Sequence, residues 1–314
     1  MCPRSSYVHA YSWLLAPVGL VLLAALCAPA ADPPRQATVR IGLSNTLTRN
    51  VPENLVQVST QPLRTLIEAE LGRKAEFQLC DPGKMPEQLA DQRLQLAVFF
   101  GHELAWARTQ HAKLTPLAIA VNQRPQLQAH LFVRKDSPAK DFAGLKGQAL
   151  AWYSANREHC RLFRDQLCEQ SNLEADQFFA RIATHHNAED ALDEVVDGTV
   201  QGVIVDNLAV DCYQRRKPGR FAQLREMVKS EPFPATVVVY QAGALDDGLK
   251  KRCRDSLLNV KQSLRGKQAL LLFKMTGFEP VPDDYEKALA AIIKAYPPPT
   301  EERAAKAQAA SAGQ

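Results

Sequence analysis

The sequence lacks the features that mark several classes of protein. It has no dense stripe of basic residues, and its formal net charge is only +4 over 314 residues, so nucleic-acid binding is not indicated. It has no CxxC pair of the kind that holds structural zinc and no glycine-rich P-loop. No Ser-His-Asp or Cys-His arrangement has a recognisable local context. We therefore expect a protein that is not an enzyme and that carries neither a cofactor nor a metal ion.

A long apolar stretch occurs at the N-terminus. Residues 12–27 are mostly Leu, Ala and Val, and they follow a short polar start that holds Arg4. Ala28-Pro29-Ala30 comes next, with small residues at the two positions that a signal peptidase reads. The stretch is short for a membrane span. We predict a signal peptide over residues 1–30, cleaved at about Ala30, and a periplasmic or secreted mature protein; the alternative is an uncleaved anchor.

Five cysteines follow the predicted signal peptide, and five is an odd number, so at least one is free or pairs between chains. Cys160 and Cys168 lie eight residues apart on one predicted helix. That spacing separates them by about 12 Å, which is too far for a disulfide. We expect the five to be core residues or to include one disulfide, whose partners the sequence leaves open: Cys80, Cys160, Cys168, Cys212 and Cys253.

The rest of the chain alternates short apolar runs of strand length with segments of helical periodicity. In the first half, strands are expected at 38–43, 75–79, 94–100 and 114–121, with helices at 62–71, 86–93 and 103–110. Next come strands at 130–134, 149–153, 180–183, 200–205 and 236–240, helices after 158, 187 and 208, and a long helix at 249–264. A helix continues at 269–273 and is expected to end at Gly277-Phe278. This alternation predicts parallel sheets covered by helices. Residues 297–314 have no core-forming residue and are predicted to be a disordered tail.

The stretch from Leu145 to Cys168 reads as turn, strand, loop and helix. A polar loop, Ser154 to Arg157, separates the apolar strand from a helix that starts at Glu158. Free backbone N–H groups and the helix dipole favour an anion in front of such a helix, and open α/β sheets bind ligands at the carboxyl ends of strands. We interpret the loop as a candidate anion site, and an ordinary strand-to-helix connection is the alternative.

Five segments in a fixed order carry a resemblance to a known family. They are MPEQLADQRLQLAVFFG (85–101), LTPLAIAV to DFAGLKG (114–147), ALDEVVDGTVQGVIVDNLAVD (191–211), VKSEPFPATVVVY (228–240) and LLLFKMTGFEPVPDDYE (270–286). Together they resemble the phosphate-, phosphite- and phosphonate-binding proteins of ABC importers, which are type II periplasmic binding proteins. The resemblance implies an α/β fold with two lobes, two α/β domains joined by two crossing strands, and a ligand cleft between them that closes by a hinge.

This resemblance also implies a domain division and a function. Residues 37–123 with 236–296 would form lobe one, and residues 124–235 would form lobe two. The protein would be the solute-binding component of an ABC importer and would capture a small anionic or zwitterionic solute similar to phosphonate or phosphate. It would present that solute to an ABC permease in the membrane, and we expect a monomer that binds no nucleic acid.

One departure from the family leaves an alternative open. The family shows Ser-Thr-Ser-Gly after the strand that follows the LKG turn, and those positions fall on Arg157-Glu158-His159-Cys160. Arg157 could bind an anion through two parallel hydrogen bonds, whereas Glu158 would oppose one. The alternative is therefore a ligand-sensing or partner-binding protein that retains the fold without the phosphonate site or the transport role.

In lobe one we select Asn45, His102 and Glu103 as ligand-binding candidates, with Trp106 as a possible wall. His102 and Glu103 follow a strand that looks buried, and a Gly-Pro pair of the family becomes Gly101-His102-Glu103 here. The alternative is a histidine at a helix start with a glutamate that caps the same turn. The string HELAW resembles the zinc-protease motif HExxH, but Trp106 stands at the second histidine position, so we reject a zinc site.

In lobe two the ligand-binding candidates lie at the ends of three predicted strands. Asp206 stands where the family places a carboxylate that meets a ligand amine or hydroxyl, and the alternative is an N-cap for the next helix. His185 and His186 are adjacent on an extended chain, so at most one of them faces the cleft. The full set is Tyr153, Ser154, Asn156, Arg157, His185 and Asp206.

Overall fold

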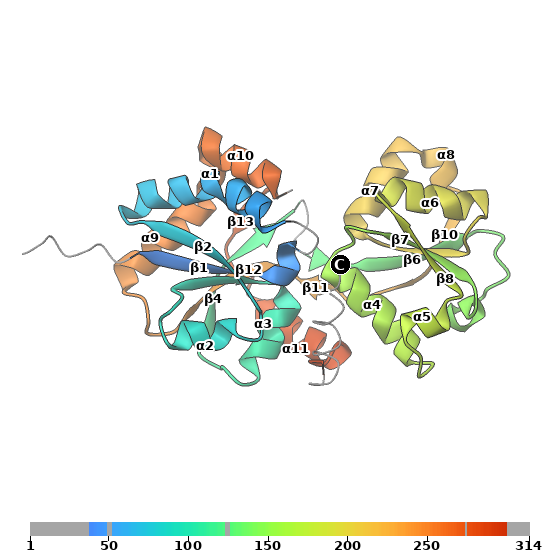
Figure 1. Ribbon diagram of the computed structural model, residues 1–314, viewed down its shortest axis with the longest axis horizontal. Helices are drawn as coiled ribbons and strands as arrows, with labels where there is room; N and C mark the ends of the chain where they lie inside the picture. The colour runs from blue at the N-terminus through green and yellow to red at the C-terminus, as the bar shows by residue number, and fades with distance from the viewer. Residues whose placement is uncertain (1–37, 49–51, 123–125, 274, 300–314) are drawn as a thin grey trace, which may run out of the picture. The chain divides into compact units, whose positions relative to one another are not determined.

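The computed structural model describes residues 38–48, 52–122, 126–273 and 275–299, and it has a two-lobed α/β fold (Figure 1). The predicted signal peptide and residues 300–314 of the predicted tail lie outside the described residues. Within the described ranges, no helix is both long enough and apolar enough to cross a membrane.

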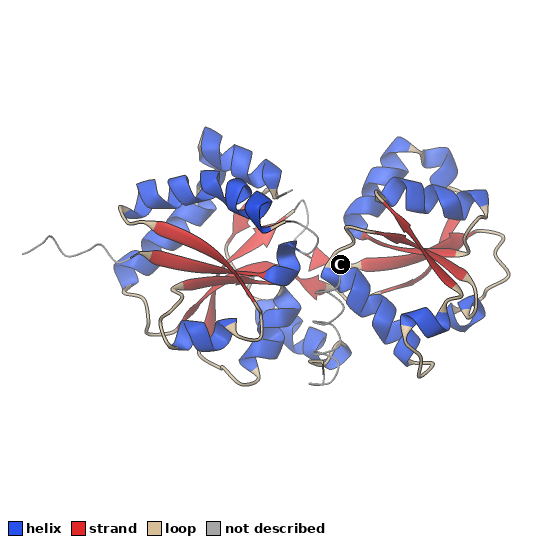
Figure 2. Ribbon diagram, in the orientation of Figure 1, coloured by secondary structure: helices blue, strands red, loops and turns tan. Residues whose placement is uncertain are grey.

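Lobe one is built on a six-stranded sheet with the order β13-β4-β12-β3-β1-β2 (Figure 2). Its strands are β1 (Val39–Ser44), β2 (Ala75–Cys80), β3 (Leu96–Phe99), β4 (Leu114–Val121), β12 (Thr236–Gln241) and β13 (Gly277–Glu279). β1 pairs in parallel with β2 and β3, but β12 runs antiparallel to both β3 and β4. The prediction of a purely parallel sheet is therefore wrong, because β12 enters the middle of the sheet from the second half of the chain.

Helices cover both faces of this sheet and enclose two apolar cores (Figure 1). On one face lie α1 (Glu53–Leu71), α9 (Asp247–Leu258) and α10 (Leu264–Leu272), with the 3-10 turns η1 (Asn45–Thr48) and η3 (Val260–Gln262). On the other face lie α2 (Met85–Ala90), α3 (Gly101–Arg108) and α11 (Tyr285–Ala295).

Three helix predictions in lobe one need correction. Helix α1 begins nine residues before Pro62, which lies inside the helix rather than in its first turn. The expected helix at 249–264 ends at Leu258, and the Ser263 side chain starts a new one by accepting a hydrogen bond from the Gly266 N–H at 2.9 Å. Gly277 begins strand β13 instead of ending a helix.

Lobe two has a five-stranded sheet with the order β10-β6-β9-β7-β8. Its strands are β6 (Ala129–Arg134), β7 (Ala149–Tyr153), β8 (Arg181–His185), β9 (Gly202–Asp206) and β10 (Leu224–Lys229). β7 lies in parallel between β8 and β9, and β6 is antiparallel to β9 and β10. This sheet is also mixed, and the strands whose ends carry the candidate residues are its parallel members.

Helices again lie on both faces of the second sheet (Figure 1). They are η2 (Phe142–Leu145), α4 (Glu158–Glu169), α5 (Ala175–Phe178), α6 (Ala188–Asp197), α7 (Asn207–Arg216) and α8 (Pro218–Phe221). A separate two-stranded ribbon pairs β5 (Gln126–Leu127) with β11 (Phe233–Pro234) in antiparallel fashion. In sequence, β5 comes before the strands of the second sheet and β11 comes after them. The two crossing segments were expected at these positions, and the exact domain boundaries stay a prediction.

All five cysteines after the predicted signal peptide are free thiols. Cys160, Cys168 and Cys253 are buried, and burial raises the pKa of each thiol. These three are core residues, which was one of the two expectations. The other, a disulfide pair, is not found among the described residues.

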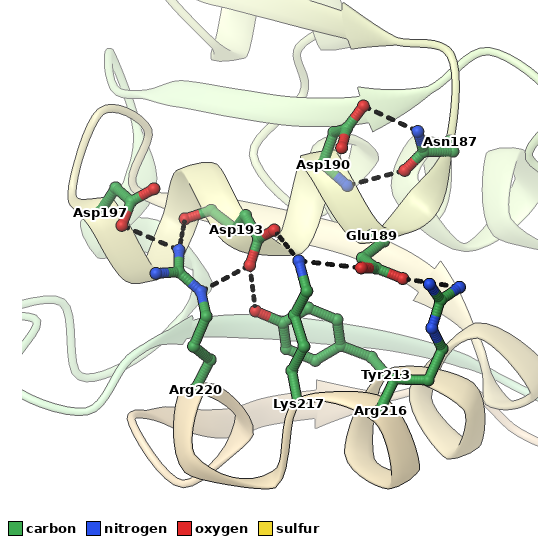
Figure 3. A network of polar contacts seen from close by, with 9 residues as sticks. All are labelled: Asn187, Glu189, Asp190, Asp193, Asp197, Tyr213, Arg216, Lys217 and Arg220. Atoms are coloured by element: carbon green, nitrogen blue, oxygen red, sulfur yellow. Dashed lines mark hydrogen bonds and ion pairs between the residues drawn. The ribbon is translucent and has the colours of Figure 1, made fainter.

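A polar network around Asp193 joins α6 to α7 and α8 (Figure 3). One oxygen of the Asp193 carboxylate accepts hydrogen bonds at 2.6 Å from the Tyr213 hydroxyl and at 2.6 Å from Nε of Arg220, and Lys217 donates to the other. Burial tends to raise the pKa of Asp193, but the hydrogen bonds outweigh it, and the pKa is lowered. The Tyr213 side chain is buried, so its hydroxyl depends on Asp193 for a partner.

We predict that Asp193→Ala lowers the free energy of unfolding by about 2 kcal/mol, because it leaves a buried hydroxyl without its acceptor. Urea denaturation followed by circular dichroism measures this loss. Asp197→Ala, at a half-exposed carboxylate that pairs with Arg220, is the control and should cost less than about 0.5 kcal/mol. Equal losses for the two variants would contradict the role given to Asp193.

Candidate functional site

The predicted site residues lie at the carboxyl ends of strands in both sheets. In lobe one, β1 and β3 end at Ser44 and Phe99, and the parallel register places Leu43 beside Val98. Asn45 opens η1 directly after β1, and its side chain is exposed. In this part of the site, Asn45 is the predicted residue that is open to a solute.

Glu103 is buried and its carboxylate is already engaged. One oxygen accepts from Ser44 Oγ at 3.1 Å and from the Thr46 hydroxyl, and the other accepts from the Phe100 N–H at 2.9 Å. Burial outweighs these hydrogen bonds and raises the pKa of Glu103 to about 7. The side chain thus closes the first turn of α3, as in the capping alternative. Ser44 and Thr46 were missed by sequence reasoning, although Ser44 ends β1 and Thr46 follows it at the same edge of the sheet.

His102 is packed among aromatic rings. Its ring centroid lies 5.5 Å from that of Phe100, 5.0 Å from that of Trp106 and 5.7 Å from that of Phe233. Burial lowers the pKa of His102 to about 3, so the ring is neutral near pH 7. Trp106 donates its indole N–H to the Tyr296 carbonyl at 2.8 Å. His102 therefore forms part of a packed aromatic cluster in the first turn of α3.

Arg157 and Asp206 form the ion pair of the site in lobe two. Arg157 is the residue that precedes α4, and its Nε lies 3.5 Å from Oδ2 of Asp206, at the end of β9. Both side chains remain partly exposed, Arg157 at 26% and Asp206 at 14%. Tyr153 lies close enough that its hydroxyl responds to both: burial and the Asp206 charge raise the pKa of Tyr153, and Arg157 opposes them.

The loop that carries Arg157 is fixed at several points. The Asn156 amide donates to the Ile204 carbonyl of β9 at 2.9 Å, and the Ser154 N–H donates to the His185 carbonyl at 2.9 Å. Asn156 therefore ties the loop to the sheet and does not cap α4. Asp206 also caps α7, because its Oδ1 accepts from the Ala209 N–H at 2.8 Å. The N-cap alternative for Asp206 is correct, and the second carboxylate oxygen still reaches Arg157.

His185 and Glu158 each lie next to an ionisable side chain that sequence reasoning did not anticipate. Nε2 of His185 lies 3.2 Å from Oε2 of Glu194, a residue of α6. Glu158 is buried and accepts hydrogen bonds from the Arg161 guanidinium three residues later. The expected opposition of Glu158 to an anion is reduced, because Arg161 compensates its charge.

The structure thus brings Tyr153, Arg157 and Asp206 together, with Ser154 and Asn156 shaping their loop. Within the described part of the chain, no group of three or more His, Cys, Asp or Glu side chains is placed to hold a metal ion. A guanidinium and a carboxylate that are both partly exposed can meet an anionic and a cationic or hydroxyl end of one small molecule. The start of α4 adds a dipole that favours an anion at the same place.

Comparisons with known proteins identify the family of this chain. The family model for the ABC transporter, phosphonate, periplasmic substrate-binding protein matches residues 48–285, which is more than half of the chain. The sequence matches no curated protein at a significant level.

Solved structures share the fold at low sequence identity. The protein XAC2383 from Xanthomonas citri, bound to ATP, is 18% identical with a TM-score of 0.58, over 82% of this chain and 96% of that one. PhnD1 from Prochlorococcus marinus, in complex with methylphosphonate, is 16% identical with a TM-score of 0.52, over 82% and 97% of the two chains. A binding protein component of an ABC phosphonate transporter from Pseudomonas aeruginosa is 17% identical with a TM-score of 0.51, over 87% and 94%. With the family match over residues 48–285, the chain belongs to the periplasmic substrate-binding proteins of phosphonate ABC transporters.

Proposed function

We propose that this protein captures a small anionic or zwitterionic solute of the phosphonate or phosphate type and delivers it to an ABC permease. The observation that carries the proposal is the partly exposed pair of Arg157 and Asp206 at the ends of β7 and β9. Membership of the phosphonate-binding family supports the solute class. The methylphosphonate bound to PhnD1 from Prochlorococcus marinus is consistent with it.

Each member of the pair has its own task in the proposed mechanism. Arg157 binds the oxyanion through its guanidinium, which replaces the hydroxyl groups that the family places in this loop. Asp206 receives an amine or hydroxyl at the other end of the solute, while its first oxygen stays on the α7 cap. Hinge closure then holds the solute between the lobes, and residues 1–30 direct the chain to the periplasm.

Arg157→Ala is expected to weaken binding of a phosphorus oxyanion by about 10- to 100-fold, since it removes a hydrogen bond between charged groups. Isothermal titration calorimetry of residues 31–314 with phosphate, phosphite, methylphosphonate and 2-aminoethylphosphonate measures this change. Arg40→Ala, at an exposed arginine in β1 of lobe one, should leave the affinity unchanged.

The same titration separates the two roles. Asp206→Asn keeps an oxygen for the cap but removes the charge, so it should weaken the aminophosphonate and not inorganic phosphate. If no phosphorus oxyanion binds the unmodified protein, or if Arg157→Ala binds as tightly as Arg40→Ala, the proposal is wrong.

A further inference from the structure

A cavity of about 220 Å³ lies between one face of the lobe-one sheet and the helices α1 and α9, and Phe273, Leu127 and Arg157 also contribute to its wall. The sheet contributes alternate residues of neighbouring strands to its wall, among them Ile41, Leu43, Leu96 and Val98. The side chains that line it are mainly aliphatic or aromatic. Such a space offers an apolar molecule the same kind of surroundings as the protein core.

The cavity is elongated along α1. Four residues of this helix line it at helical spacing: Thr60, Leu63, Ile67 and Leu71. From Thr60 to Leu71 the helix rises by about 16 Å. An apolar space lined over this length of helix can receive an extended chain of methylene groups.

One end of the cavity reaches the candidate site. Its wall includes Thr48 in η1, Phe100 at the start of α3, Asn122 just after β4, and Arg157 itself. These residues follow the carboxyl ends of strands, whereas Leu71 ends α1 just before β2 starts at Ala75. The cavity therefore runs from the arginine of the site toward the opposite edge of the sheet.

Two polar groups in the wall are buried without a hydrogen-bond partner among the described residues: Ser256 Oγ and Asn122 Nδ2. The Ser256 side chain belongs to a residue that is only 8% exposed. Buried polar groups in folded proteins are nearly always paired, and leaving one unpaired is unfavourable. Asn122 lies at the end of the cavity that Arg157 lines, so its Nδ2 can donate to an oxyanion headgroup there.

We infer that the cavity binds the aliphatic chain of an anionic amphiphile, an alkylphosphonate or alkyl phosphate whose headgroup lies at Arg157. The inference rests on the proposed function, because it takes the same oxyanion as the headgroup. An apolar cavity of about 150 Å³ accommodates a benzene molecule, so the larger space here fits a chain of about eight carbon atoms. The solute would then be a lipid-like phosphonate rather than the smallest members of the class.

Calorimetric titration of residues 31–314 with methyl-, butyl-, hexyl-, octyl- and dodecylphosphonate tests the inference. Affinity should rise by about fourfold for each methylene group that enters the cavity and stop rising beyond octylphosphonate. Ala120→Leu places extra volume in the cavity wall and should remove most of the gain from the chain while methylphosphonate binds as before. Ala120→Ser, which changes the volume little, is the matched control and should keep the chain-length dependence.

The outcomes distinguish this inference from the proposed function. If methylphosphonate binds and all chain lengths bind equally, the alkyl site is overturned and the proposed function stands. If the Ala120→Leu protein keeps the full chain-length dependence, the chain lies elsewhere and the inference is again overturned. If neither phosphate nor any phosphonate binds the unmodified protein, the proposed function fails together with the inference.

Discussion

When the pH falls from 7.5 to 5, the free energy of unfolding is expected to drop by about 4 kcal/mol less in the His102→Leu/His159→Leu variant than in the unmodified protein. Burial lowers the pKa of both imidazoles from 6.5 to about 3. The unfolded chain binds a proton at each histidine below pH 6.5, whereas the folded protein does not until about pH 3. Stability is therefore present above pH 6.5 and falls as the pH drops, by about 2 kcal/mol for each histidine at pH 5.

The reason for these low pKa values is visible in the packing. His102 has Phe100, Trp106 and Phe233 around it, and the ring centroid of His159 lies 5.4 Å from that of Phe233. A protonated imidazole there would lose its hydration without a full replacement. Glu158 favours the charged form of both rings, but its effect is smaller than that of burial.

Urea titrations at pH 7.5, 6.5, 5.5 and 5 give the free energies for this comparison. Other groups titrate in the same way in both proteins, so the difference between them isolates the two histidines. His186→Leu, at an exposed side chain, is the control and should leave the pH dependence unchanged. A double variant that loses as much stability on acidification as the unmodified protein would show that these histidines are hydrated in the folded state.

The fold could be predicted where the pattern is local. The apolar runs of β4 (Leu114–Val121) and β7 (Ala149–Tyr153) have the predicted bounds, because a strand buried on both faces is apolar throughout. Gly72 and Gly198 end helices in the left-handed region, at φ of 63° and 78°, which is the usual place of glycine after a helix. The relative directions of the strands could not be predicted from local patterns, because they depend on β12, which returns from the second half of the chain to pair between β3 and β4.

The candidate site shows the same division between local and distant contacts. The caps made by Glu103 and Asp206 involve neighbours three residues away, and the sequence already offered both as alternatives. The Glu158–Arg161 pair has helical i, i+3 spacing and could have been found from that signal. The Arg157–Asp206 pair joins residues on either side of β8 and α6, and it exists because β7 and β9 are neighbours in the sheet. Only the strand order reveals such a contact.

Glu103→Gln is expected to gain about 3 kcal/mol of stability relative to the unmodified protein as the pH rises from 4.5 to 8. Burial raises the pKa of Glu103 from 4.5 to about 7, so the folded protein keeps a proton that the unfolded chain releases above pH 4.5. The stability of the unmodified protein therefore falls as the pH rises through this window, and it levels off above about pH 7. A glutamine does not ionise and avoids this loss, whose size follows from the difference between the pKa of 4.5 in the unfolded chain and that of about 7 in the folded protein.

The shape of the Glu103 site explains why the glutamine should be tolerated. Its carbonyl oxygen can accept from the Phe100 N–H, and its amide can donate to the hydroxyl of Ser44 or Thr46, which rotates to accept. Glu103→Ala lacks both contacts and should be less stable than the unmodified protein at pH 5, because it leaves the first turn of α3 without its cap. Glu70→Gln, at an exposed position of α1, should change neither the stability nor its pH dependence. If thermal or urea unfolding gave parallel pH profiles for Glu103→Gln and the unmodified protein, the pKa of Glu103 in the folded protein would have to equal its value of 4.5 in the unfolded chain, with the hydroxyls of Ser44 and Thr46 stabilising its charge.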